Sequence, residues 1–264
     1  MAEEQVDMRF VRESWEVPGH ISDYVEAVYK VGLLDSERLL VSRYFSKNDR
    51  ILDIGCGAGR TTLGLYRLGY LNVQGVDLSG GMIERAKFMA KEAGCPIPFE
   101  VGDATDLQWG DRSLDAALFC GQGFMCIPGY DNRLQALNEV RRVLRPGGHF
   151  IFTTHDRDAV REFADFWEKE EASWDAGTQD GRLLEFGDRI IVDSGTPTFI
   201  HIPTREKVIE MVQRSGLVLV EDSMRSELSV ETKAVREFSV DCRMWVVQRP
   251  RPTGDLPGNG NSHD

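Results

Sequence analysis

The sequence predicts an α/β fold in which helices cover both faces of a largely parallel sheet. Two observations lead to this prediction. Short apolar segments of strand type alternate with amphipathic helical segments from about residue 50 to residue 154, which is the pattern of βαβ units. A glycine-rich turn, with Gly55, Gly57 and Gly59, follows the first of these strands. Open α/β sheets bind their ligands at this carboxyl edge, so we expect the functional site there.

Each element of the alternating region follows from its own local pattern. We expect strands over 50–54, 73–77, 97–101, 114–119 and 148–154, and helices over 59–68, 80–93 and 131–145. Within the second helix, Met82, Ala86 and Met89 form an apolar stripe, and Gly94 suits its C-terminal end. The run Pro146-Gly147-Gly148 is expected to end the third helix.

Two segments flank or interrupt this pattern. Residues 1–48 are predicted to form an N-terminal helical arm or lid, with Ser22 as the N-cap of a helix that carries Tyr24. The region that follows, 49–249, is expected to form the main domain, and its rhythm breaks at 155–200, which is polar and then β-like over 183–193 and 198–202. We expect this insertion to form a cap over the carboxyl edge of the sheet.

After the insertion, the alternation of helical and strand-like segments resumes, and it ends near residue 249. A helix is expected from Thr204, followed by strand-like segments over 217–221 and 242–248. From 250 to 264, proline and glycine recur without an apolar pattern. That composition predicts a disordered tail.

Composition limits the class of protein. The 264 residues carry a formal net charge of −12, which disfavours unspecific nucleic-acid binding, because that binding depends on Lys and Arg. No apolar run approaches the roughly 20 residues of a membrane helix. Five cysteines form no C-x-x-C pair, and the start shows no secretory pattern. We therefore expect a cytoplasmic protein with reduced thiols, no metal site and a small-molecule partner.

The spacing of the glycines in this loop differs from that of a dinucleotide-binding loop. A dinucleotide-binding fingerprint requires G-x-G-x-x-G, and its third glycine falls on Arg60 here. Asp53 precedes Gly55 by two residues. A carboxylate at this place suits a nucleotide-like ligand that carries a positive amino group and would repel a pyrophosphate.

This loop resembles the cofactor-binding motif of the class I S-adenosylmethionine-dependent methyltransferases. Four further matches follow in the order of that family, at Gly75–Ser79, Gly102–Ala104, Leu114–Phe119 and Glu139–Gly148. The resemblance implies a Rossmann-like seven-stranded sheet of order 3-2-1-4-5-7-6, with strand 7 antiparallel, and S-adenosyl-L-methionine as the cofactor. The remaining alternative is a NAD-binding or other nucleotide-binding module.

The resemblance also assigns cofactor contacts. It implies that Asp53 holds the ammonium group through water or backbone, and that Asp77 binds the ribose hydroxyls. The other implied contacts are to the backbone at Gly55 and Gly57, to the carboxylate at Arg60, to adenine at Leu78, Met82, Asp103 and Ala104, and to the methyl path at Cys120. For several of these residues a structural role stays open: a strand-end cap for Asp53, a solvated position for Arg60, a core position for Met82 and a turn for Asp103.

The sequence is less specific about the residues that bind the methyl acceptor. His155 follows the fifth strand and either accepts the acceptor's proton or serves the structure, while Tyr24, Gln122 and His201 are candidate substrate contacts. Residues 155–190 carry eleven acidic and five basic side chains, which favours a cationic amine over a hydroxyl. We therefore expect methyl transfer to a nitrogen or oxygen of a small molecule. The alternatives are a methyltransferase acting on RNA or protein, and a non-catalytic S-adenosylmethionine-binding module.

Overall fold

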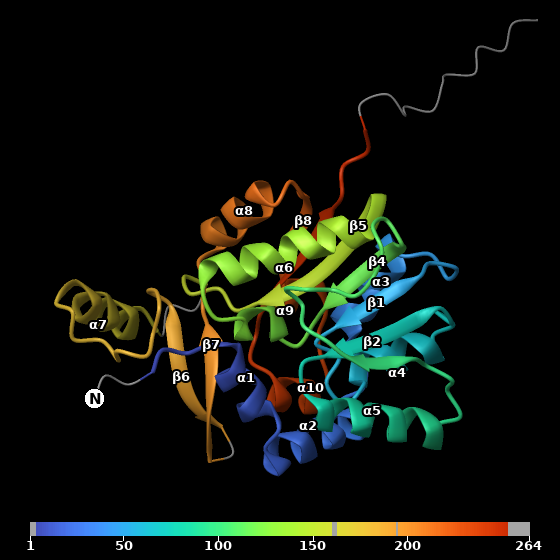
Figure 1. Ribbon diagram of the computed structural model, residues 1–264, viewed down its shortest axis with the longest axis horizontal. Helices are drawn as coiled ribbons and strands as arrows, with labels where there is room; N and C mark the ends of the chain where they lie inside the picture. The colour runs from blue at the N-terminus through green and yellow to red at the C-terminus, as the bar shows by residue number, and fades with distance from the viewer. Residues whose placement is uncertain (1–3, 160–162, 194, 253–264) are drawn as a thin grey trace, which may run out of the picture.

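A seven-stranded sheet forms the centre of the structure, a computed structural model that describes residues 4–159, 163–193 and 195–252 (Figure 1). The strands are β1 (Ile51–Ile54), β2 (Val73–Asp77), β3 (Phe99–Val101), β4 (Leu114–Phe119), β5 (Leu144–Thr154), β8 (Val218–Met224) and β9 (Arg243–Gln248). Their order is β3-β2-β1-β4-β5-β9-β8, and β9 runs antiparallel to both of its neighbours. The predicted order is confirmed, with β8 and β9 as the sixth and seventh strands.

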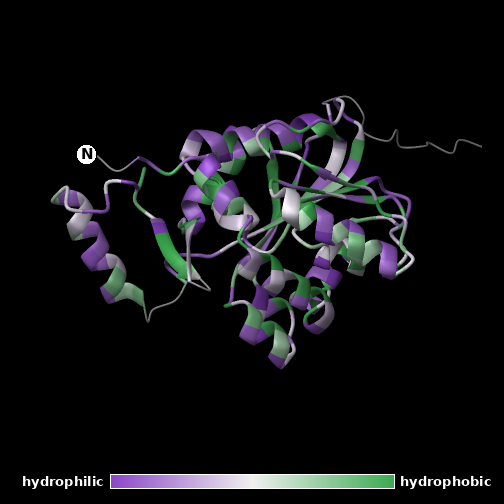
Figure 2. Ribbon diagram, turned by 60° about the horizontal axis from the view of Figure 1, so that its bottom comes forward, coloured by the Kyte–Doolittle hydropathy of each residue, from purple (hydrophilic) through white to green (hydrophobic). Residues whose placement is uncertain are grey.

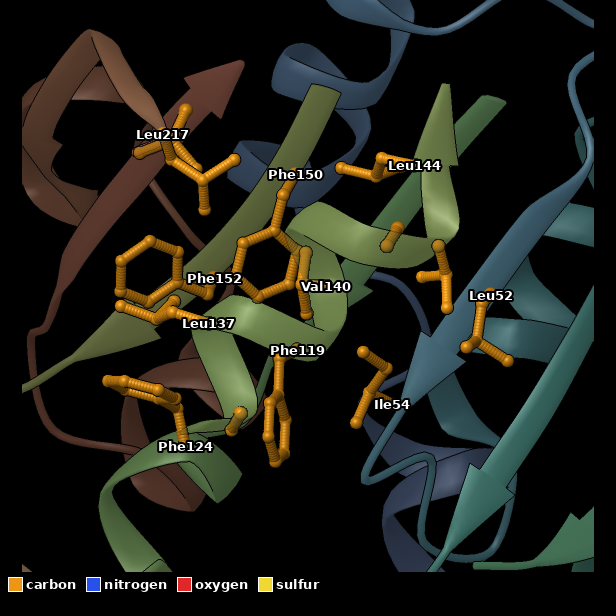
Figure 3. Packing of buried hydrophobic residues seen from close by; sticks show 14 of the residues in the cluster. Leu52, Ile54, Phe119, Phe124, Leu137, Val140, Leu144, Phe150, Phe152 and Leu217 are labelled. Carbon is orange, nitrogen blue, oxygen red and sulfur yellow. The ribbon is translucent and has the colours of Figure 1, made fainter. Parts of the chain in front are cut away.

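Helices cover both faces of this sheet, as predicted. The helices around the sheet are α3 (Asp35–Tyr44), α4 (Arg60–Arg67), α5 (Gly80–Glu92), α6 (Tyr130–Val143) and α8 (Arg205–Arg214). On one face, Val140 of α6 and Val212 of α8 pack in one core cluster with Phe150 of β5; Figure 3 shows part of this packing. On the other face, Leu40 of α3 packs in a second cluster with Ile51.

The boundary between α6 and β5 differs from the prediction. The helix ends at Val143, and β5 already begins at Leu144, which pairs with Leu114 of β4. The run Pro146-Gly147-Gly148 therefore lies inside the strand and does not end the helix. Its glycines suit this place, because a Cβ on Gly148 would lie 2.8 Å from the carbonyl oxygen of Asp115.

The N-terminal arm is helical, with α1 (Met8–Trp15), α2 (Pro18–Lys30) and α3. The prediction of Ser22 as an N-cap is wrong, because α2 begins four residues earlier at Pro18. Proline is favoured at the first helical position, where the missing N–H would have no partner within the helix. Helix α2 therefore starts earlier in the chain than predicted, and it carries Tyr24 to the carboxyl edge of the sheet.

The insertion after β5 contains a helix and a hairpin. Helix α7 (Ala164–Asp175) has no buried side chain; its Trp167 and Trp174, seven residues apart, both contact the ring of Phe186. The hairpin pairs β6 (Asp188–Asp193) with β7 (Thr196–His201) in antiparallel register. Figure 2 shows the hydrophobic stretch of strand β6.

The end of the chain adds two short helices between β8 and β9, namely α9 (Arg225–Leu228) and α10 (Lys233–Phe238). Most of the predicted tail, residues 253–264, lies outside the described residues. In the part of the chain that is described, no helix has the length and apolar character needed to cross a bilayer.

Candidate functional site

A cleft of about 730 Å³, which includes its open mouth, lies at the carboxyl ends of β1, β2 and β4. It brings together seven of the residues predicted for the site: Tyr24, Gly55, Gly57, Asp77, Leu78, Met82 and Ala104. Asp77 is the one charged residue among the described residues that line it. The cleft thus combines an apolar surface with a single carboxylate.

The glycine loop forms the floor of this cleft. Gly55 and Gly57 both have positive φ values, 60° and 54°, a conformation that side chains with a Cβ rarely adopt. A Cβ on Gly55 would collide with the ring of Phe119, and one on Gly57 would lie 3.3 Å from the ring of Tyr24. The loop therefore needs glycine for its backbone conformation and for close approach.

Asp77 ties the end of β2 to this loop. Its Oδ2 accepts a hydrogen bond from the backbone N–H of Gly57 at 2.8 Å, and its Oδ1 accepts one from the N–H of Ser79 at 2.9 Å. Burial raises the pKa of the Asp77 carboxyl, although these hydrogen bonds act in the opposite direction. Because each carboxylate oxygen has a further lone pair, Asp77 can also accept hydrogen bonds from a ligand in the cleft.

Asp53 lies beneath the loop, not on the cleft surface. The residue is 1% exposed, and its Oδ2 accepts a hydrogen bond from the hydroxyl of Thr62 on α4 at 2.6 Å. Burial raises the pKa of Asp53 to about 7, with the Thr62 hydrogen bond acting against the shift. Its charge can reach a ligand only through intervening backbone or water.

The guanidinium of Arg60 is committed to the N-terminal arm. It donates to both carboxylate oxygens of Glu37, at 2.8 and 2.7 Å, and to the carbonyl oxygen of Gly32. The Arg60 side chain is only 10% exposed, so the alternative of a solvated position is wrong. Arg60 does not line the cleft but a smaller cavity beside it.

Two further predicted contacts are replaced by their chain neighbours. Asp103 does not line the cleft; its Oδ1 accepts hydrogen bonds from the backbone N–H and the hydroxyl of Thr105, both at 2.8 Å, which is the turn-forming alternative. Gly102 and Ala104 line the cleft instead. Cys120 is buried, and this burial raises the pKa of its thiol; the next residue, Gly121, reaches the cleft surface.

The outer wall of the cleft comes from the N-terminal arm. Met8, Val11 and Trp15 of α1 line it together with Tyr24 of α2, and Trp15 packs edge-on against Tyr24 at 5.3 Å between ring centroids. Only the grouping of aromatic residues before the first strand hints at this wall in the sequence. Its formation depends on how α1 and α2 pack onto the sheet.

The insertion lies behind this wall. None of its described residues lines the cleft, so the prediction of 155–200 as the cap directly over the site is wrong for this cleft. Phe199 of β7 is fully buried in a cluster with Val6 and Val11, and Figure 1 shows α1 beside β7. The hairpin therefore supports α1, which in turn walls the cleft.

His201 belongs to a separate buried ionic cluster. Its Nδ1 lies 2.7 Å from Oδ1 of Asp188, and Glu185 pairs with the buried Arg133. One ligand atom from each of Glu185, Asp188 and His201 could approach a common metal ion. All three side chains already have protein partners. We therefore interpret the cluster as a set of paired charges that anchors the hairpin.

Neither His155 nor Gln122 lines the cleft, and Gln122 lines the smaller cavity beside it. Burial lowers the pKa of the His155 imidazole, and Arg225 contributes to this shift, so the ring is neutral at pH 7. Gln122 has a φ of 62° and donates through its backbone N–H to the hydroxyl of Thr153 at 3.0 Å. A non-glycine residue at positive φ costs energy and recurs at functional sites.

Comparisons with known proteins agree with this geometry. A family model described as "Methyltransferase domain" matches residues 51–148. The chain is 38% identical over 130 residues to a probable methyltransferase, ltbC, of Aspergillus luteorubrus. It is 32% identical over 108 residues to the O-methyltransferase cnsE of Penicillium expansum. These matches cover 46% and 40% of this chain, but only 45% and 38% of the two relatives, so the chain spans about half or less of their length.

Solved structures share the fold. A SAM-dependent methyltransferase from Methanosarcina mazei matches with a TM-score of 0.64 and 20% identity, over 80% of this chain and 97% of that one. The [4+2]-cyclase SpnF matches with a TM-score of 0.67 and 18% identity, over 95% and 100%. At these identities the likeness concerns the fold alone. Taken with the sheet order, the glycine loop and the matched domain, it leads to one conclusion: the chain has the fold of the class I S-adenosylmethionine-dependent methyltransferases, and its residues 51–148 match a methyltransferase domain.

Proposed function

We propose that this chain transfers the methyl group of S-adenosylmethionine to a nucleophilic oxygen or nitrogen of a small molecule. The observation that carries the proposal is the cleft itself. It joins a carboxylate at the end of β2 to a loop whose glycines, Gly55 and Gly57, leave room for a ligand against the backbone. The accepting oxygens of this carboxylate fit a ribose, which presents hydroxyl groups and carries no negative charge.

The rest of the cleft fits the remainder of the cofactor. Leu78 and Met82 offer an apolar surface for adenine beside Asp77, and Ala104 closes the other side. When bound, S-adenosylmethionine supplies a methyl group on a positive sulfur; the carbon–sulfur bond breaks as the bond to the acceptor atom forms, and the acceptor releases a proton. The protein's task is to hold the two reactants in line and to exclude water.

The N-terminal wall supplies that exclusion. Met8, Val11 and Trp15 place apolar side chains over the cleft, and Tyr24 adds a ring with a polar tip. An acceptor that enters between this wall and Gly121 is held against the cofactor. We assign Tyr24 to the acceptor contact and Gln122 to the rim of the same region.

The structure favours a hydroxyl acceptor over the amine expected from charge. The acidic side chains of 155–190 that the structure describes do not line the cleft, so they place no negative charge on its surface that would attract a cationic amine. The relative named an O-methyltransferase points in the same direction. An enclosed, mainly apolar cleft also suits a small molecule better than an RNA or a protein surface.

The test is turnover with a labelled methyl group. The protein is incubated with S-adenosylmethionine that carries a ¹³C-methyl group and with pools of phenols, alcohols and amines, and mass spectrometry follows labelled products and S-adenosylhomocysteine. We expect a labelled ether or amine with wild type and much less with Asp77→Ala. Cofactor binding without a labelled product in any pool would refute methyl transfer. The cyclase among the structural neighbours has the same fold, so that result would point to a non-methylating role.

A further inference from the structure

A second, smaller cavity of about 320 Å³, which includes its open mouth, lies beside the cleft, at the carboxyl ends of β4 and β5. Gly121 lines both spaces. A Cβ on Gly121 would meet no atom within 4 Å, so the chain leaves open space where the two cavities adjoin. A ligand that fills the cleft can therefore extend one of its ends into the second cavity.

A buried cation, Arg225, lines this second cavity and has one donor without a partner among the described residues. Arg225 of α9 is 4% exposed, and its Nη2 donates to the carbonyl oxygen of Ser239 at 2.8 Å. Its Nη1 is buried and has no hydrogen-bond partner among the described residues. Buried polar groups are rarely left without a partner, because the lost hydrogen bonds to water are costly.

The nearest carboxylate does not satisfy this cation. Oδ1 of Asp241 lies 3.9 Å from Nε of Arg225, which is beyond hydrogen-bond distance. That oxygen already accepts from the backbone N–H groups of Ser226 and Cys242. The cavity's other arginine, Arg60, is neutralised by Glu37. Arg225 therefore has only a long ion pair with Asp241 and keeps one donor, Nη1, without a hydrogen-bond partner.

The proposed cofactor carries a negative group that a cation such as Arg225 could bind. Its adenosine half would occupy the cleft at Asp77 and Leu78, and its other end is an amino acid with a carboxylate. Of the described residues that line the cleft, only Asp77 is charged, and it is anionic, so none of them offers this carboxylate a cation. The adjoining cavity does, at the point where Gly121 leaves the passage open.

We propose that Arg225 binds the carboxylate of the cofactor's amino-acid end. The assignment rests on the proposed use of S-adenosylmethionine and concerns where its second half lies. It transfers to Arg225 the role that the sequence suggested for Arg60, whose guanidinium Glu37 already occupies. A bidentate guanidinium–carboxylate pair is a strong and directional contact.

Two ligands that differ only in this end provide the test. S-adenosylhomocysteine carries the amino-acid carboxylate, and 5′-methylthioadenosine lacks it. Calorimetry measures the dissociation constant of each for the wild type, Arg225→Gln and Arg225→Lys. We expect Arg225→Gln to weaken S-adenosylhomocysteine about 10- to 100-fold and to change 5′-methylthioadenosine less than about twofold. Arg225→Lys keeps the charge without the planar fork, so its loss should be smaller but have the same selectivity.

A matched control lies on the neighbouring helix. Arg236 of α10 donates to the backbone oxygen of Glu231 and lines neither cavity, so Arg236→Gln should leave both dissociation constants unchanged. An equal loss for both ligands in Arg225→Gln, or no loss for either, would overturn the inference. If Arg225→Gln does not fold, Arg225→Lys decides the question by the same ratio. Failure of the wild type to bind S-adenosylhomocysteine would instead refute the proposed cofactor.

Discussion

Asp53 allows a stability measurement whose sign follows directly from its burial. An aspartate in an unfolded chain titrates near 3.9, whereas burial raises the pKa of Asp53 in the folded protein to about 7. Between these two values the folded state binds more protons than the unfolded state. The free energy of unfolding therefore falls as pH rises from about 4 to about 7, and the loss is complete above that window.

The magnitude is large for a single side chain. A shift of about three pKa units corresponds to about 4 kcal/mol at pH 8. Asp53→Asn removes the titration and keeps an oxygen that accepts the hydrogen bond of Thr62. The raised pKa already includes the Thr62 hydrogen bond, so we expect the variant to exceed wild type in free energy of unfolding by up to about 4 kcal/mol at pH 8. Near pH 4 the two proteins should have about equal stability.

Urea unfolding at pH 4.5, 6 and 8, without ligand and at constant ionic strength, measures this difference. Asp115→Asn serves as a control of opposite sign, because hydrogen bonds from Arg50 lower the pKa of Asp115 against the effect of its burial; that variant should lose stability at pH 8. If Asp53→Asn is no more stable than wild type at pH 8, or if the difference does not vary with pH, Asp53 is not held in the way described. Asp53→Asn should also weaken S-adenosylhomocysteine binding, since the negative charge of Asp53 favours the ligand while it destabilises the fold.

Three further predictions concern the cleft and its wall. Asp77→Ala should weaken S-adenosylhomocysteine about 10- to 150-fold in calorimetry, and wild-type affinity in a folded variant would contradict the ribose assignment. Phe199→Ala should cost about 3–5 kcal/mol in urea unfolding and reduce ligand affinity by loosening α1; unchanged affinity would mean that the hairpin does not support the wall. His155→Gln should lower turnover less than about fivefold, because the ring lines neither cavity. A loss of a hundredfold or more, with a changed acid limb of the pH profile, would instead establish proton acceptance.

Local patterns in the sequence were sufficient to predict the sheet and the floor of the cleft. Strand and helix periodicity predict the alternating elements, and the connection rules of parallel sheets bring the ends of β1, β2 and β4 together. Gly55 and Gly57 lie in the first three residues after β1, and Asp77 is the last residue of β2. Their positions in the cleft therefore follow from the chain's local geometry, as do those of Leu78 and Met82.

Tertiary packing decided which polar groups remain available to a ligand. The carboxylate of Asp53 is held by Thr62, and the guanidinium of Arg60 by Glu37 of the N-terminal arm. Arg225 has no motif in the sequence, and only the packing of α9 brings it beside Gly121. Helix α7 likewise buries no side chain, and it is tied to the insertion by the contacts of Trp167 and Trp174 with Phe186. Burial and the choice of a hydrogen-bond partner depend on residues far apart in the chain, and a local pattern cannot encode distances between them.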